Sequence, residues 1–174
     1  MSSHPRQSTP PSAGPPLARD DGSAAVPGVI APPPLIYLGG VAAGFGLEAL
    51  LPSPSVPRAL LWPVGVALIV VGGALALSFV RDFACAGTPV SPYAPSTKLV
   101  TTGVYRLSRN PGYLGMALVY CGIALVTGSL WALLPLVPVL GVIDRGVIAR
   151  EERFLERRFG REYLRYKRRT RRWL

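Results

Sequence analysis

The sequence predicts an all-α integral membrane protein, a bundle of about four transmembrane helices with a helical, cytosolic C-terminal segment. Of its 174 residues, 49% are hydrophobic and 16% charged, and the mean hydropathy is +0.35. A soluble domain carries about 25% charged residues. Residues 59–80 and 110–143 contain no Asp, Glu, Lys or Arg, and a helix needs about 20 apolar residues to cross a bilayer. The composition therefore excludes an ordinary soluble enzyme, and the length fits one domain.

Residues 1–33 are expected to form a disordered, cytosolic tail ahead of a membrane domain over 34–174. Nine of the 19 prolines lie within residues 1–34, and no apolar periodicity is present there. Such a composition does not bury enough apolar surface to fold. The tail also lacks the apolar core of a secretory signal peptide, so we expect the mature protein to keep it.

Membrane helices are predicted over residues 34–51, 59–80, 111–127 and 130–159, followed by a short helix over 161–170. In the first helix, the spacing of Gly40 and Gly44 favours close packing within the bundle over dimerisation. The charge-free stretch 110–143 is too long for one straight crossing. The Thr-Gly-Ser sequence at 127–129 therefore predicts a tight turn between the third and fourth helices.

The distribution of basic residues predicts how the bundle is oriented. The loop 81–109 carries three Arg and one Lys, and segment 145–172 carries eleven Arg and one Lys, whereas the turn at 127–129 is uncharged. The positive-inside rule places both basic segments in the cytosol, and four crossings then place the N-terminus there too. Only Arg58 opposes this arrangement. We expect the basic segment to contact anionic lipid, worth about 1 kcal/mol per residue near the surface, and expect no nucleic-acid partner.

The inventory of reactive side chains excludes several kinds of site. Cys85 and Cys121 are the two cysteines, and His4 is the one histidine. A CxxC zinc site is absent, and a histidine-based metal site or catalytic triad cannot be built from one histidine in a Pro-rich tail. No metal is expected, and the chemistry must come from Arg, Glu, Asn, Tyr, backbone groups or a cofactor.

Two segments are more polar than a simple membrane anchor requires. The first comprises residues 98–115 and leads into the third membrane helix. Asn110 is expected at the N-cap of that helix and Pro111 in its first turn. A helix N-terminus suits a carboxylate or a phosphate. A capped helix with interfacial arginines and tyrosines accounts for the same pattern without a ligand, and both interpretations stay open here.

The second polar segment, residues 150–166, contains a carboxylate in an apolar setting. On a continuous helix, Glu152 shares a stripe with Ile148, Leu155 and Phe159. A carboxylate that faces the bundle is costly unless it is paired or used. Pairing of Glu and Arg along a solvated helix is the alternative, and it explains Glu156 and Glu162 better than it explains Glu152.

Together the two segments carry a resemblance to a known superfamily. Its residues are Gly103, Val104, Tyr105, Arg106, Arg109, Asn110, Pro111, Tyr113 and Gly115, then Glu151, Glu152, Leu155, Phe159, Gly160, Tyr163, Tyr166, Arg172, Trp173 and Leu174. In this order, around a membrane hairpin, they resemble the isoprenylcysteine carboxyl methyltransferase and phospholipid methyltransferase superfamily over about 80–174. The resemblance implies an integral membrane enzyme that binds S-adenosylmethionine and methylates a lipophilic acceptor, either a small molecule or a lipid.

The same resemblance implies the residues of the site. Arg109 and Glu152 are the expected catalytic residues. The expected cofactor contacts are Leu99, Val100, Gly103, Tyr105, Arg106, Asn110, Pro111, Tyr113, Glu151, Glu152, Tyr163 and Tyr166. Arg106 or Arg109 can hold the carboxylate of the cofactor, and the tyrosines can place an aromatic face near its sulfonium.

Departures from the superfamily pattern keep other functions open. Many relatives have His at the position of Asn110, so a histidine acid or base is excluded here, and the prenylcysteine acceptor is not assumed. Nicotinamide-dependent membrane reductases of the steroid-reductase type share an Arg-His-Pro-Asn-Tyr pattern. Gly112 and the pair Glu151 and Glu152 favour methyl transfer over reduction. A non-catalytic membrane protein is the third possibility.

Overall fold

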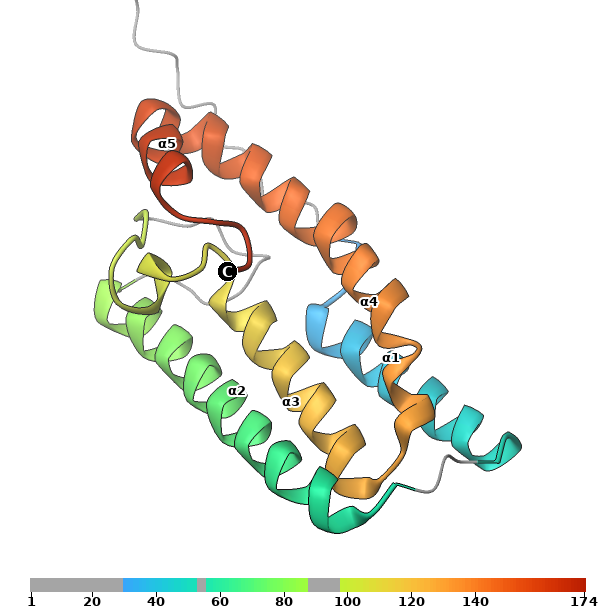
Figure 1. Ribbon diagram of the computed structural model, residues 1–174. Helices are drawn as coiled ribbons and strands as arrows, with labels where there is room; N and C mark the ends of the chain where they lie inside the picture. The colour runs from blue at the N-terminus through green and yellow to red at the C-terminus, as the bar shows by residue number, and fades with distance from the viewer. Residues whose placement is uncertain (1–29, 53–55, 88–97) are drawn as a thin grey trace, which may run out of the picture.

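The computed structural model describes residues 30–52, 56–87 and 98–174. Within these residues the regular secondary structure consists of helices, without strands (Figure 1). This confirms the all-α prediction. The elements in chain order are α1 (Pro33–Leu50), α2 (Arg58–Ala86), the 3-10 helix η1 (Gly103–Arg106), α3 (Pro111–Thr127), the 3-10 helix η2 (Leu130–Leu133), α4 (Leu136–Val142), the π-helix η3 (Ile143–Ile148) and α5 (Ala149–Arg169). Most of the proline-rich tail, residues 1–29, lies outside the described residues, as does 88–97.

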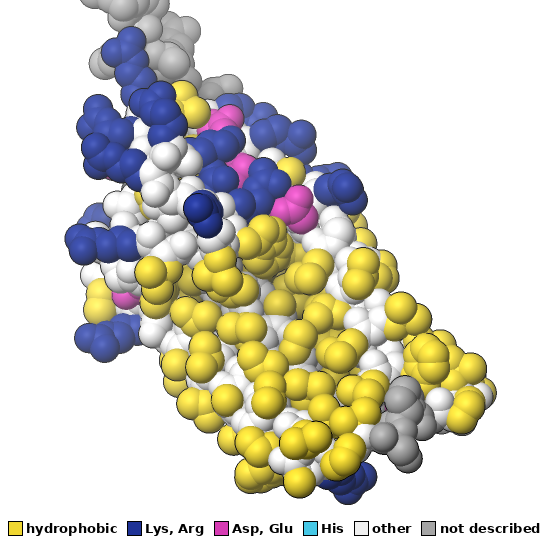
Figure 2. All heavy atoms as spheres, viewed as in Figure 1, with side chains coloured by type: hydrophobic (Ala, Val, Ile, Leu, Met, Phe, Trp, Pro, Cys, Tyr) yellow, Lys and Arg dark blue, Asp and Glu magenta, His cyan; other side chains and the backbone are white. Residues whose placement is uncertain are grey.

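Three helical stretches are long and apolar enough to cross a bilayer, namely Pro33–Leu50, Arg58–Ala86 and Leu130–Arg169. α3 is apolar but has 17 residues, about 26 Å at 1.5 Å per residue. These lengths indicate an integral membrane protein. Figure 2 shows hydrophobic side chains over most of the bundle and Lys and Arg crowded at the α5 end.

Two helices differ from their expected courses. α2 continues to Ala86, so Arg81 and Asp82 lie on a helix rather than in a loop. The expected single helix over 130–159 is divided into η2, α4, η3 and the start of α5. α5 then bends at Gly160, whose φ of 49° and ψ of −121° are not helical. After this bend the chain turns back toward α3 (Figure 1).

α2 and α3 approach each other closely along two pairs of glycines. A Cβ built on Gly72 would lie 2.6 Å from the carbonyl oxygen of Gly115, and one built on Gly122 would lie 2.6 Å from that of Gly65. Only glycine allows the two backbones to come this near. Close approach gives dispersion contact that hydrophobic burial cannot replace inside a lipid bilayer.

α1 packs on the other side of α3, against η2 and α4. A Cβ on Gly40 would collide with Val139, and one on Gly44 would lie 2.8 Å from the Cβ of Ala132. The predicted packing of these two glycines within the bundle is therefore confirmed. Buried tyrosines fix this side of the bundle, because the hydroxyl of Tyr120 donates to the carbonyl of Ala132 at 2.7 Å.

Candidate functional site

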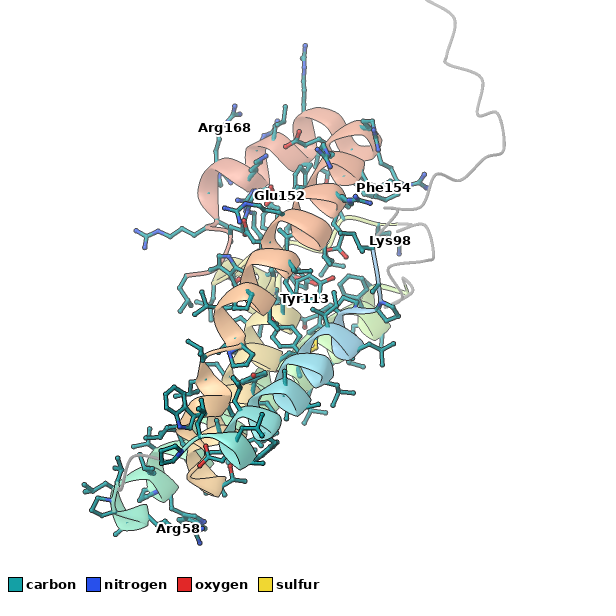
Figure 3. The ribbon with its side chains drawn as sticks, turned by 90° about the vertical axis from the view of Figure 1, so that its right-hand side faces the viewer. Arg58, Lys98, Tyr113, Glu152, Phe154 and Arg168 are labelled. Atoms are coloured by element: carbon teal, nitrogen blue, oxygen red, sulfur yellow. The ribbon has the colours of Figure 1, made fainter. Side chains whose placement is uncertain are left out.

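A polar cluster lies where α3 begins and η3 runs into α5, and Glu152 is at its centre (Figure 3). The side chain of Glu152 is 7% exposed, so it faces inward as its place on the apolar stripe predicts. Ile148, on the same stripe, is fully buried. Three cations surround this one carboxylate. We call Glu152, Arg109, Arg172, Lys167 and Asp144 the Glu152 cluster.

Arg172 makes the closest contacts with Glu152. Its Nη2 donates to Oε2 at 2.6 Å and its Nε to Oε1 at 3.2 Å, which is a bidentate pair. Nη1 of Arg172 also donates to both oxygens of Asp144, at 3.2 and 3.1 Å. The hydrogen bond with Glu152 raises the pKa of Arg172. Arg172 therefore links two carboxylates that come from different turns of the same membrane stretch.

Residues 170–174, which we call the closing segment, bring Arg172 into this position. The backbone N–H of Arg109 donates to the carbonyl of Arg171 at 3.0 Å. The carbonyl of Arg172 accepts from Nδ2 of Asn110 at 2.9 Å and from Oγ of Ser108 at 3.2 Å. The closing segment is thus tied by hydrogen bonds to the turn that precedes α3.

The side chain of Asn110 bonds to the closing segment rather than to the first turn of α3. Asn110 lies at the N-cap position of α3, but its side chain makes no capping hydrogen bond. Its amide instead holds the closing segment at the Arg172 carbonyl. The predicted N-cap position of Asn110 is therefore confirmed, but its side chain does not make the hydrogen bond to the first turn of α3 that usually accompanies this position.

Arg109 is the most deeply placed cation of the Glu152 cluster. Its side chain is 10% exposed, and Nη1 lies 3.1 Å from Oε1 of Glu152. Nη1 makes this ion pair without a hydrogen bond, and both Nη1 and Nε are buried without a hydrogen-bond acceptor among the described residues. Buried donors without acceptors are rare, because each costs about 1–3 kcal/mol. They are where an acceptor supplied by a ligand would be held.

Asp144 belongs to this cluster, although the sequence did not single it out. Besides Arg172, it accepts a hydrogen bond from Nε1 of Trp173 at 3.2 Å. It lies on the π-helix η3, and π-turns inside helices often occur at functional sites. The available signal was its position, since Asp144 is the first charged residue after the charge-free stretch 110–143.

The predicted tyrosines divide into two groups. Tyr113 donates to Oε1 of Glu151 at 2.6 Å, and Tyr163 is buried beside Arg109. Tyr105 instead packs at a tilt against two aromatic residues of α2, with its ring centroid 5.9 Å from that of Phe83. Burial raises the pKa of Tyr105 well above its usual value. Tyr166 joins the two groups, because its hydroxyl donates to the carbonyl of Tyr105 at 2.8 Å.

The remaining predicted residues have structural settings of their own. Gly103 has a φ of 60°, and a side chain there would collide with Asp82, whose Oδ2 accepts from the N–H of Val104 at 3.2 Å. Arg106 is exposed. Three further residues are more enclosed: Leu99 and Val100 are half-buried, and Pro111 is buried in the first turn of α3. The structure thus places Arg109, Asn110 and Glu152 together, while Gly103 and Tyr105 pack against α2.

Among the residues that the structure describes, no group of His, Cys, Asp and Glu gathers in a way that could hold a metal ion. The Glu152 cluster and the neighbouring Tyr113, Glu151 and Tyr163 offer charged and aromatic side chains, with donors on Arg109 and acceptors on Glu152 and Glu151.

Comparison with known proteins identifies the family of this chain. The family model described as "Phospholipid methyltransferase" matches residues 60–162, which include most of α2, all of α3 and α4, and Glu152. A protein of Haemophilus influenzae described as "Uncharacterized protein" is 44% identical over 62 residues, which are 36% of this chain and 98% of that protein. No solved structure matches. With more than half of its length matched by the family model, the chain belongs to the phospholipid methyltransferase family.

Proposed function

We propose that the protein is an S-adenosylmethionine-dependent methyltransferase that acts on a lipophilic or membrane-embedded acceptor. Membership of the phospholipid methyltransferase family indicates a methyltransferase. The observation that supports the cofactor is the buried pair of Arg109 and Glu152, where a guanidinium with two unfilled donors lies 3.1 Å from a carboxylate. The methionine part of S-adenosylmethionine is an amino acid zwitterion, so its binding site needs one cation and one anion that are shielded from water.

The residues fit the methionine end of such a cofactor. Nε and Nη1 of Arg109 are buried donors that suit its carboxylate. Glu152 and the neighbouring Glu151 offer acceptors for its ammonium and ribose hydroxyls. Tyr113 and Tyr163 are buried or half-buried at the same end of the bundle and can place aromatic faces near a positive sulfur.

When bound, the cofactor supplies a methyl group on a positively charged sulfonium. The protein then has to orient the two reactants and exclude water, for which the buried pair of Arg109 and Glu152 is suited. No histidine lies among the described residues, so any proton that leaves the acceptor has to go to a carboxylate, a tyrosine or water. We propose further cofactor contacts from residues of both polar segments. They are Leu99, Val100, Gly103, Tyr105, Arg106, Asn110, Pro111 and Tyr166.

Ligand binding tests this proposal against the reductase alternative. We expect purified protein in mild detergent to bind S-adenosylmethionine and its demethylated product in isothermal titration calorimetry. It should show no measurable binding of NADH or NADPH, because the proposed site is matched to an amino acid zwitterion. Tight nicotinamide binding without S-adenosylmethionine binding would move the protein to the reductase class.

We also propose that the Glu152 cluster lies at the cytosolic side of the membrane, because basic residues gather there. Cys85 is exposed near the end of α2 that meets η1, and Cys121 is half-buried within α3. In sealed vesicles of known orientation, a membrane-impermeant maleimide should label Cys85 only from the cytosolic side and should leave Cys121 unlabelled. Labelling of Cys85 from the opposite side would reverse the orientation.

A further inference from the structure

An apolar groove runs beside the Glu152 cluster, between α3 and the stretch from α4 to η3. Its volume is about 390 Å³, and it is lined by Leu114, Ala117, Leu140, Gly141, Asp144, Arg145 and Trp173. That volume lies near the lower end of the range of about 300–1,000 Å³ for small-molecule sites. The groove therefore has room for one hydrocarbon chain rather than for a bulky multi-chain lipid.

The two ends of the groove differ in chemistry. Leu114, Ala117, Leu140 and Gly141 line the part within the bundle, where the surrounding surface is hydrophobic (Figure 2). The charged lining residues, Asp144 and Arg145, lie in η3, the π-helix that follows α4. An occupant has to be apolar along most of its length and polar at one end.

The charge at the polar end is set by Arg145. The carboxylate of Asp144 is already matched by Arg172 and by Nε1 of Trp173. Arg145 is exposed and makes no ion pair or hydrogen bond with any residue in the described part of the chain. Its Nη1 lies 3.7 Å from where a Cβ on Gly141 would be, so the guanidinium is folded back over the groove.

We propose that this groove binds a single-chain anionic amphiphile, with the hydrocarbon chain between α3 and α4 and the anionic headgroup on Arg145. A cation in an apolar groove at the edge of the charge-free stretch attracts a negative headgroup and discriminates against a cationic one. A carboxylate and a phosphate satisfy this chemistry equally. The site does not require the proposed methyl transfer, although a molecule bound there lies next to Asp144, which contacts Arg172 of the Glu152 cluster.

Tryptophan fluorescence gives a direct test, because Trp173 lines the groove and the chain has three tryptophans. Trp62→Phe and Trp131→Phe in the full chain leave Trp173 as the reporter. The probes are palmitic acid brominated at the middle of the chain, the corresponding alkyl phosphate and the corresponding alcohol, each titrated in a nonionic detergent. We expect saturable quenching by both anions at concentrations at least about tenfold below that of the alcohol, since bonds to charged groups are worth this much.

Matched variants show whether the groove and its cation are responsible. Arg145→Gln should remove the advantage of the anions over the alcohol, while Arg168→Gln, an exposed arginine of α5, should keep it. Gly141→Leu should abolish saturable quenching, because it fills the groove at a position where a Cβ meets only the tip of Arg145. Thermal unfolding of each variant checks that it is folded.

Three results would overturn the inference: equal quenching by acid and alcohol, an effect of Arg168→Gln as large as that of Arg145→Gln, or quenching that persists in Gly141→Leu. Quenching by the phosphate alone or by the carboxylate alone would keep the site and identify the headgroup. Native mass spectrometry of the unsubstituted chain with the same probes gives the comparison without tryptophan substitutions. Calorimetry with S-adenosylmethionine on the same samples shows separately whether the proposed function fails.

Discussion

α3 meets α2 through glycines, whereas the residues just before α3 meet the closing segment through hydrogen bonds and α5 through charge. Along the first interface, Gly72 and Gly115 bring two backbones into contact without a polar side chain between them. At the second, Arg109 and Asn110, just before α3, contact Glu152 and the Arg172 carbonyl respectively. The first interface thus depends on close packing of backbones, and the second on ion pairs and hydrogen bonds.

The comparison separates an interface that supplies stability from one that holds the proposed site. Within a bilayer, helices gain little from hydrophobic burial, so close packing of small residues supplies the association. The Glu152 cluster contributes less than its number of ion pairs implies, because desolvation of buried charges offsets their attraction.

The largest expected effect is on the glycine interface. Gly72→Ala puts a Cβ 2.6 Å from the Gly115 carbonyl oxygen and 2.9 Å from the Val119 nitrogen, so the two backbones must separate. We expect a loss of about 3 kcal/mol in the free energy of unfolding, the upper part of the overpacking range. The measurement is the denaturation midpoint in detergent, followed by α-helical circular dichroism.

The neighbouring Gly73 provides the control for this prediction. A Cβ on Gly73 meets nothing within 4 Å, and alanine has the higher helix propensity, so Gly73→Ala should be neutral or stabilise by up to about 1 kcal/mol. If Gly72→Ala and Gly73→Ala unfold alike, the close approach of α2 and α3 is not what holds the bundle.

A second change acts on the charged interface and should affect binding more than folding. Glu152→Gln keeps the shape of the side chain but removes the charge that faces Arg109 and Arg172. We expect S-adenosylmethionine binding to weaken by about 1.5–3 kcal/mol, the value of a charged hydrogen bond, or roughly tenfold to more than a hundredfold. Calorimetry measures the binding, and the amount of protein recovered from membranes reports on folding.

Glu156→Gln is the matched control, since Glu156 lies on the same helix and pairs with Lys167 at a more exposed position. It should bind the cofactor like the parent chain. Normal binding by both variants would make Glu152 a structural partner of the arginines and remove it from the proposed site.

The smallest expected effect concerns a neutral hydrogen bond inside the bundle. Tyr120→Phe removes the hydroxyl that donates to the Ala132 carbonyl at 2.7 Å but keeps the ring against α1. We expect a loss of about 0.5–1.5 kcal/mol in the free energy of unfolding and unchanged cofactor affinity. A change in cofactor affinity of tenfold or more would mean that α1 and the Glu152 cluster are coupled.

The sequence predicted the helical class and the inward position of Glu152, because apolar run lengths and helical spacing are local properties of the chain. It did not predict the role of Asn110, because the partner of its amide is the carbonyl of Arg172, 62 residues away. Asp144 was missed for a related reason. A regular α-helix was expected where the chain forms a π-turn, and the position of a side chain beyond such a turn does not follow from α-helical spacing.

The bend at Gly160 decides whether the closing segment can reach Glu152 at all. An α-helix rises 1.5 Å per residue, so a straight α5 would carry Arg172 about 18 Å farther along the axis than Gly160. The left-handed φ of 49° turns the chain back instead. The length of the returning helix is then constrained as well, because each added or removed residue would rotate the remainder of the chain by about 100°. One residue inserted after the bend would carry Tyr163 out of its buried position and move Arg172 away from the carboxylate of Glu152. The length of the helical segment after Gly160 therefore sets the geometry of the Glu152 cluster.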